Sequence, residues 1–151
     1  VQKLTNPILV TGGFREMLIL RWSQRLAGIF YPVNERKNLI MIEDIHSAAD
    51  MDRLVTEEKG YVLLWLWAAW CRPCQVMAPA VQALEERFAG KIRVVRMEVD
   101  EQEELAEGFG LVGVPTFILY KDGEETGRII GYRMKAKFFE ELEAMMKENK
   151  G

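Results

Sequence analysis

Residues 65–74 have the sequence WLWAAWCRPC, which holds three of the four tryptophans and both cysteines of the 151-residue chain. The residues that lead into the cysteines, 61–67 (YVLLWLW), are apolar at every position. A strand buried on both faces of a sheet has this composition, as in a parallel or mixed sheet covered by helices. After the cysteines, residues 75–88 have apolar positions at helical spacing. These positions are Val76, Met77, Ala80, Val81, Leu84 and Phe88.

The two cysteines, Cys71 and Cys74, are candidates for redox chemistry. A bridge across so short a loop stabilises little, so a disulfide scaffold is disfavoured. A zinc site needs about four ligands, whereas the chain offers one CxxC motif and one histidine, His46, which we interpret as a boundary residue before a helix. A dithiol redox pair therefore fits best, and two reduced, buried, structural thiols are the alternative.

The predicted strand-to-helix junction gives the two cysteines different roles. Free N–H groups and the helix dipole favour an anion at the first turn, so we expect Cys71 to titrate low and act as the nucleophile. Cys74 lies one turn further in and suits the resolving step. Arg72 adds a nearby cation, and Pro73 fits the first helical turn. Pro79 falls inside the helix and should kink it.

The rest of the chain extends a pattern of alternating strands and helices. The order βαβαβαββα predicts an α/β fold with a central mixed sheet covered by helices on both faces. The Asp122-Gly123 pair predicts a hairpin, and Ser47 is a candidate N-cap. The predicted strands are 39–42, 61–67, 92–99, 116–120 and 127–130, and the predicted helices are 48–58, 75–88, 101–107 and one around 138–146.

From about residue 38 to residue 147 the chain resembles the thioredoxin family. The resemblance rests on an ordered set of motifs: WCRPC at 70–74, Pro79, Val99-Asp100, GVPT at 113–116, KDGE at 121–124 and Gly131. It implies the thioredoxin fold and a thiol–disulfide oxidoreductase that acts on protein disulfides. The Cys71–Cys74 disulfide would be the redox centre, without a cofactor or a metal. The partners would be disulfide-containing client proteins and an external thiol reductant or reductase.

The resemblance also implies a substrate groove beside the cysteines. Pro115 would follow a cis peptide bond, which is essentially a proline phenomenon, and the backbone of Val114 would pair with an extended segment of the client. We expect Trp70 to form a partly exposed docking surface, whereas Trp65 and Trp67 belong to the core. The groove would be edged by Trp70, Arg72, Pro73, Gly113, Val114, Pro115 and Gly131.

Three positions depart from the family pattern. Trp65 stands where thioredoxins usually carry a buried acid that helps to take the proton from the second cysteine. Arg72 replaces the usual glycine between Cys and Pro, and Tyr132 replaces the small residue after Gly131. These departures predict a divergent thioredoxin with its own client. The missing acid leaves a second function class open, a thioredoxin-fold binding or chaperone-like module with little turnover.

Residues 1–38 lie outside the resemblance and differ from the rest in charge. They carry six basic and two acidic side chains, a net charge of +4. The remaining residues have a net charge of −7, so the whole chain has a net charge of −3. The negative total charge argues against nucleic acid as a partner. Residues 13–30 predict a helix with one apolar face, either docked on the acidic domain at 39–151 or lying on a membrane surface. The face consists of Phe14, Leu18, Trp22, Leu26 and Ile29.

The sequence also bears on compartment. It has no apolar run of about 18 residues, the length that a membrane span needs, and no signal-peptide pattern. We therefore expect the cytoplasm, with a membrane-associated or exported form as the alternative. The oligomeric state is left open.

Deletion of residues 1–37 tests the role of this extension. If the 13–30 helix docks on the domain, the truncated chain should stay folded and redox-active but melt at a lower temperature, because each buried large apolar side chain stabilises by about 1.5–3 kcal/mol. An unchanged melting temperature, together with random-coil chemical shifts for residues 13–30 in the full chain, would exclude docking. Binding to anionic vesicles that is lost on deletion would favour the membrane surface.

Overall fold

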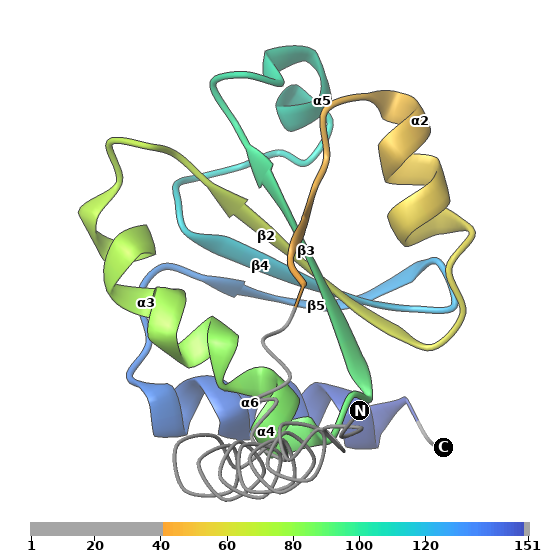
Figure 1. Ribbon diagram of the computed structural model, residues 1–151, viewed down its shortest axis with the longest axis vertical. Coiled ribbons are helices and arrows are strands. Elements are labelled where there is room, and N and C mark those ends of the chain that lie inside the picture. The colour runs from red at the N-terminus through yellow and green to blue at the C-terminus, as the bar shows by residue number, and fades with distance from the viewer. Residues whose placement is uncertain (1–40, 150–151) are drawn as a thin grey trace, which may run out of the picture. The chain divides into compact units, whose positions relative to one another are not determined.

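A computed structural model describes residues 41–149 of the chain (Figure 1). The helix predicted over 13–30 and the boundary predicted after residue 38 lie outside the described residues. The elements are β1 (Glu43–Asp44), α2 (Ala48–Met51), a π-helical turn η1 (Asp52–Thr56), β2 (Tyr61–Trp67), α3 (Arg72–Gln82), α4 (Leu84–Phe88), β3 (Ile92–Glu98), α5 (Glu103–Glu107), β4 (Thr116–Lys121), β5 (Glu124–Ile130) and α6 (Lys135–Glu148).

The strands form one five-stranded sheet in the order β1-β3-β2-β4-β5. β3 pairs in parallel with both β1 and β2, whereas β4 pairs antiparallel with both β2 and β5. Figure 1 shows α3, α4 and α6 on one face of the sheet and α2 and α5 on the other. The predicted mixed sheet with helices on both faces is confirmed.

The central strand β2 is buried because both of its faces meet an apolar cluster. Its odd-numbered side chains, such as Leu63 and Trp65, belong to the cluster under α3, α4 and α6. Its even-numbered side chains, such as Leu64 and Leu66, belong to the cluster under α2, η1 and α5. β3 also contributes to both clusters, so its burial extends beyond the single face that the sequence pattern indicated.

The first strand begins later than predicted. Met41 and Ile42, the described part of the strand expected over 39–42, precede β1. Strand pairing begins at Glu43, opposite Val95 of β3. Ion pairs join the two strands in this register: Arg96 bonds to Asp44 at 2.5 Å, and Arg93 pairs with Glu43.

The helix after the cysteines differs from the prediction in two ways. α3 continues through Pro79 to Gln82, and the interruption before α4 falls at Ala83. Pro79 is exposed, so water can solvate the carbonyl that its missing N–H leaves unpaired. Val76, predicted to face inward, is 50% exposed. It lies one residue before the buried Met77, which is about 100° around the helix axis.

The remaining local predictions agree with the structure at the level of elements. Ser47 caps α2 and accepts the backbone N–H of Asp50 at 3.1 Å. The helix predicted over 48–58 is present as α2 followed by η1, with Leu54 and Val55 buried. β4 and β5 form the predicted hairpin around Asp122.

The hairpin turn between β4 and β5 packs against the loop between η1 and β2. Gly123 has a φ of +86°, and a Cβ at this position would overlap the carbonyl oxygen of Thr56. The Asp122 carboxylate accepts the backbone N–H of Gly60 at 2.8 Å, and this bond lowers the pKa of Asp122. The bond therefore stabilises the fold at neutral pH, and its contribution is lost as acid protonates the carboxylate.

Gly123→Ala should destabilise the full chain by about 1–3 kcal/mol in chemical denaturation, since the new side chain combines backbone strain with overlap. Gly110→Ala is the matched control, because Gly110 has a φ of +59° but open space where its Cβ would be. An equal loss of stability in both variants would show that the contact with Thr56 contributes nothing.

Candidate active site

The two cysteines lie at the junction between β2 and α3. After Trp67 the chain turns through residues 68–70, and the N–H of Cys71 donates to the carbonyl of Ala68 at 3.0 Å. Cys71 is the N-cap of α3, Pro73 lies in the first turn, and Cys74 follows one turn in. The junction predicted from the sequence is therefore present.

Cys71 and Cys74 form a disulfide with their Cα atoms 5.3 Å apart. Both are buried, with exposed fractions of 2% and 0%. The backbone N–H of Cys74 points back to the Sγ atom of Cys71 at 3.2 Å. A sulfur at this place accepts a helix N-terminal N–H, and the dipole of the 11-residue helix α3 favours negative charge there.

Two acidic side chains, one at the end of β3 and one just after it, bond to the turn that precedes Cys71. Glu98 accepts the N–H of Ala69 at 2.9 Å with one oxygen and the N–H of Glu101 at 2.8 Å with the other. Asp100 accepts the indole N–H of Trp70 at 2.6 Å. These contacts were not predicted. The only sequence signal was an acid at the end of a strand, which does not tell which loop the acid will meet.

The segments predicted to edge a groove lie close to the cysteines. The Val114–Pro115 bond is cis, as the resemblance implies. Val114 packs against the cluster that holds both cysteines, and the N–H of Gly131 donates to the carbonyl of Pro115 at 2.8 Å. The N–H of Arg133 reaches Met77 Sδ of α3 at 3.4 Å. The structure therefore joins the three segments around residues 70–74, 113–115 and 131.

The predicted groove residues differ in how accessible they are. Trp70 is 70% exposed. Arg72, Pro73 and Gly113 are also exposed, whereas Val114 and Gly131 are half-buried and Pro115 is buried. Large exposed apolar side chains accompany these segments. They are Val76, Val112, Ile130, Tyr132 and Met134.

The three departures from the family pattern occupy different environments. Trp65 is 4% exposed and lies in the same apolar cluster as the cysteines, and Trp67 packs against that cluster half-buried. The assignment of both tryptophans to the core is confirmed. Arg72 is exposed, and no ion pair to it is found among residues 41–149. Tyr132 is 50% exposed.

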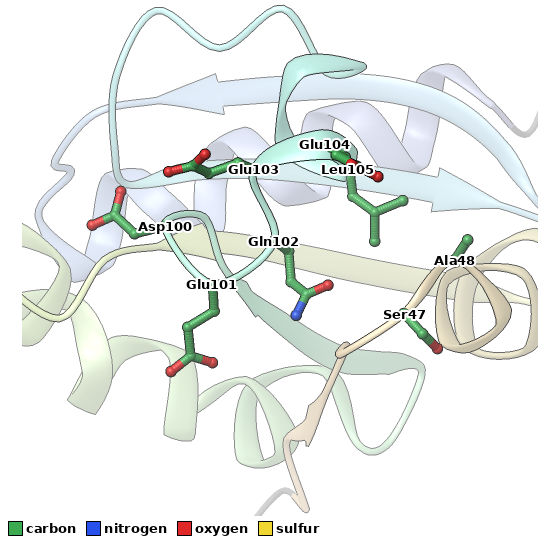
Figure 2. Close-up of a pocket in the computed structure, with 8 residues that line it drawn as sticks. All are labelled: Ser47, Ala48, Asp100, Glu101, Gln102, Glu103, Glu104 and Leu105. Atoms are coloured by element: carbon green, nitrogen blue, oxygen red, sulfur yellow. The ribbon is translucent and has the colours of Figure 1, made fainter.

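A separate cavity of about 680 Å³ lies beyond Asp100. Figure 2 shows the loop after β3 and the start of α5 on one side of it, and Ser47 and Ala48 on the other. Its walls carry four carboxylates and no cysteine. Asp100, which accepts the indole N–H of Trp70, is thus one of the four acidic residues in this cavity wall.

Within 41–149 no three His, Cys, Asp or Glu side chains gather in a way that could hold a metal ion. None of the helices in this range has the length and apolar character needed to cross a bilayer.

Comparison with known proteins gives a consistent result. Residues 44–144 match the family model described as Thioredoxin. The thioredoxin of Listeria monocytogenes is 40% identical over 82 residues, covering 54% of this chain and 80% of that protein. The thioredoxin of Mycobacterium tuberculosis is 35% identical over 109 residues, covering 72% and 90%. A structure of a mutant thioredoxin from Halobacterium salinarum matches with a TM-score of 0.63 at 29% identity, covering 71% and 92%.

The fold and the paired cysteines define a thiol–disulfide oxidoreductase, an enzyme that acts through the Cys71–Cys74 dithiol. The chain belongs to the thioredoxin family. Disulfide-containing substrates and a reductase are the partners that this family implies in general.

Proposed function

We propose that Cys71 attacks client disulfides and that Cys74 resolves the product. The observation that carries this assignment is the 3.2 Å contact from the Cys74 N–H to Cys71 Sγ at the start of α3. Such a donor stabilises a thiolate on Cys71, and the exposed cation of Arg72 acts in the same sense. Cys74 has no exposed surface and is accessible only to a sulfur already bonded at Cys71.

The proposed reaction has two exchanges. In the first, the Cys71 thiolate attacks one sulfur of the client disulfide, forms a mixed disulfide and releases the other client sulfur as a thiolate. In the second, Cys74 loses its proton to water and attacks Cys71 Sγ. The Cys71–Cys74 disulfide forms again and the second client thiolate leaves. An external thiol reductant or a reductase then returns two electrons and two protons to the pair.

We further propose that the client lies across the exposed rim of the site. Trp70, Arg72 and Pro73 would contact it on one side, and Gly113, Val114, Pro115 and Gly131 on the other. The 70% exposure of Trp70 supports a docking role, because a large apolar surface beside a reactive centre favours contact with a partner. The backbone of Val114 would pair with an extended client segment.

We propose that the enzyme reduces client disulfides and that it does so in the cytoplasm. Thiols are kept reduced there, and a chain with only two cysteines, both in one CxxC motif, suits catalysis rather than a disulfide scaffold. Residues 1–38 form a separate extension in this proposal, and their contact with a membrane surface is tested by the deletion given above.

Cys74→Ser should accumulate a mixed disulfide with a disulfide-containing client such as insulin, because the first exchange can proceed and the second cannot. Cys71→Ser should accumulate none. Non-reducing electrophoresis and intact mass measure the adduct. Equal trapping by the two variants, or trapping by Cys71→Ser alone, would contradict the assignment.

The pH profile tests whether the second exchange is limited by the proton on Cys74. With a pre-reduced full chain and insulin in excess, the rate of complete reduction should rise between pH 6 and pH 9 as this thiol ionises. In the Cys74→Ser variant only the first exchange can occur, so the rate of mixed-disulfide formation reports the attack by Cys71 alone. This rate should level off at a lower pH than the rate of complete reduction. A flat profile for the unmodified chain over the same range would exclude a proton-limited second step.

A further inference from the structure

The surroundings of Cys74 lack a buried base. The cluster around it consists of aliphatic, aromatic and sulfur-containing side chains. No Asp, Glu, His, Lys or Arg side chain described within residues 41–149 is buried, and the buried Tyr120 belongs to the cluster on the other face of the sheet. Burial in apolar surroundings disfavours a thiolate and raises the pKa of a thiol. The second exchange therefore needs some other group to stabilise the negative charge on Cys74.

The charged groups of the neighbouring strands are engaged elsewhere. On β3, Glu98 binds two backbone N–H groups, and Arg96 binds Asp44 while its guanidinium lies 5.2 Å from the centre of the Trp67 ring. Asp100, which follows β3, binds the Trp70 indole. β4 and β5 contribute Phe117, Leu119 and Ile129 to the cluster, none of which ionises.

The polar groups of β2, of the helices over this face and of the loop before α6 are also engaged with other partners or exposed. The Tyr61 hydroxyl donates to the carbonyl of Met146. Arg133 binds Glu141, and Arg87 pairs with Glu143. Lys135 lies over the ring of Phe139. Arg72 on α3 is exposed. None of these groups bonds to Cys74 in the disulfide form.

Trp65 and Trp67 are the exceptions among the polar atoms described on this face. The indole N–H of Trp65 is buried and has no hydrogen-bond partner among residues 41–149. The ring is held by Phe117, with the ring centres 5.9 Å apart and the planes 18° apart. A buried donor without an acceptor costs about 1–3 kcal/mol, and buried donors without partners are rare in native structures. An acceptor that exists only in another state of the enzyme would explain it.

We propose that the Trp65 indole N–H donates a hydrogen bond to the Cys74 thiolate as this thiolate forms. The proposal rests on the resolving role proposed for Cys74. The indole keeps its own proton throughout, and the proton of Cys74 passes to water. Trp65 thus stabilises the anion on Cys74, whereas the buried acid of other family members would accept the proton. The site replaces a base with a hydrogen-bond donor.

Trp67 provides the matched control. It lies on the same strand and the same face, and its indole N–H is also buried without a partner in the part of the chain that the structure describes. Its ring, however, is half-buried at the end of β2 and lies under the Arg96 guanidinium. Substitution by phenylalanine removes the N–H at either position and keeps an aromatic ring.

Trp65→Phe should raise the pH midpoint of the second exchange by about one pH unit. Below the midpoint this slows the exchange about tenfold, the size expected for one hydrogen bond to a charged sulfur. In the Cys74→Ser background the same substitution should leave the attack by Cys71 unchanged. Trp67→Phe should move neither step. An unchanged midpoint in Trp65→Phe, or an equal shift in Trp67→Phe, would overturn the proposal.

A second measurement does not depend on turnover or on the folding of Trp65→Phe. In the reduced full chain, selective ¹⁵N labelling of tryptophan gives one indole signal for each ring, and substituting the other three tryptophans one at a time assigns the fourth to Trp65. This signal should move downfield with the titration of Cys74, and Cys74→Ser should abolish the movement. A Trp65 indole signal that does not move as Cys74 titrates would overturn the proposal.

The outcomes separate this inference from the proposed roles of the cysteines. If Cys74→Ser fails to trap a client while the Trp65 signal follows the Cys74 titration, the roles fail and the hydrogen bond stands. If trapping succeeds while the midpoint and the indole signal stay fixed, the hydrogen bond alone fails.

Discussion

The burial of β2 on both faces is the constraint on which the rest of the structure depends. Its side chains alternate between two apolar clusters, one under α3, α4 and α6 and one under α2, η1 and α5. β3 and β4 occupy both of its edges. A strand held on four sides has a fixed register, since a shift by one residue would exchange its two faces. The chain therefore leaves the sheet at a defined point after Trp67, and Cys71 begins α3 four residues later.

The residues at the end of β3 also help to position the turn before Cys71. Glu98 ties the turn before Cys71 to the loop after β3, and Asp100 holds Trp70 from the same loop. The parallel pairing of β2 with β3 brings these two loops together at one end of the sheet. The dithiol is thus positioned by neighbouring strands, while the cis peptide before Pro115 and the bond from Gly131 bring the hairpin side of the sheet to it.

Local patterns were sufficient to predict much of this arrangement. An unbroken apolar run, a CxxC motif and a helical stripe placed the cysteines at a strand-to-helix junction, and Asp122-Gly123 placed the hairpin. The contacts of Glu98 and Asp100 could not be predicted in this way, because they join segments about 30 residues apart. The exposure of Val76 and the break at Ala83 depend on how α3 lies on the sheet, which helical periodicity alone does not determine.

The bond between Trp70 and Asp100 has a consequence for molecular recognition. An indole that is 70% exposed would ordinarily sample several rotamers. Here its N–H is anchored at 2.6 Å to a carboxylate, so the loss of side-chain freedom occurs during folding. A client that docks on this ring loses less conformational entropy on binding than it would on a mobile one. In the docking role proposed for Trp70, this preorganisation would leave more of the binding free energy to order the client segment itself.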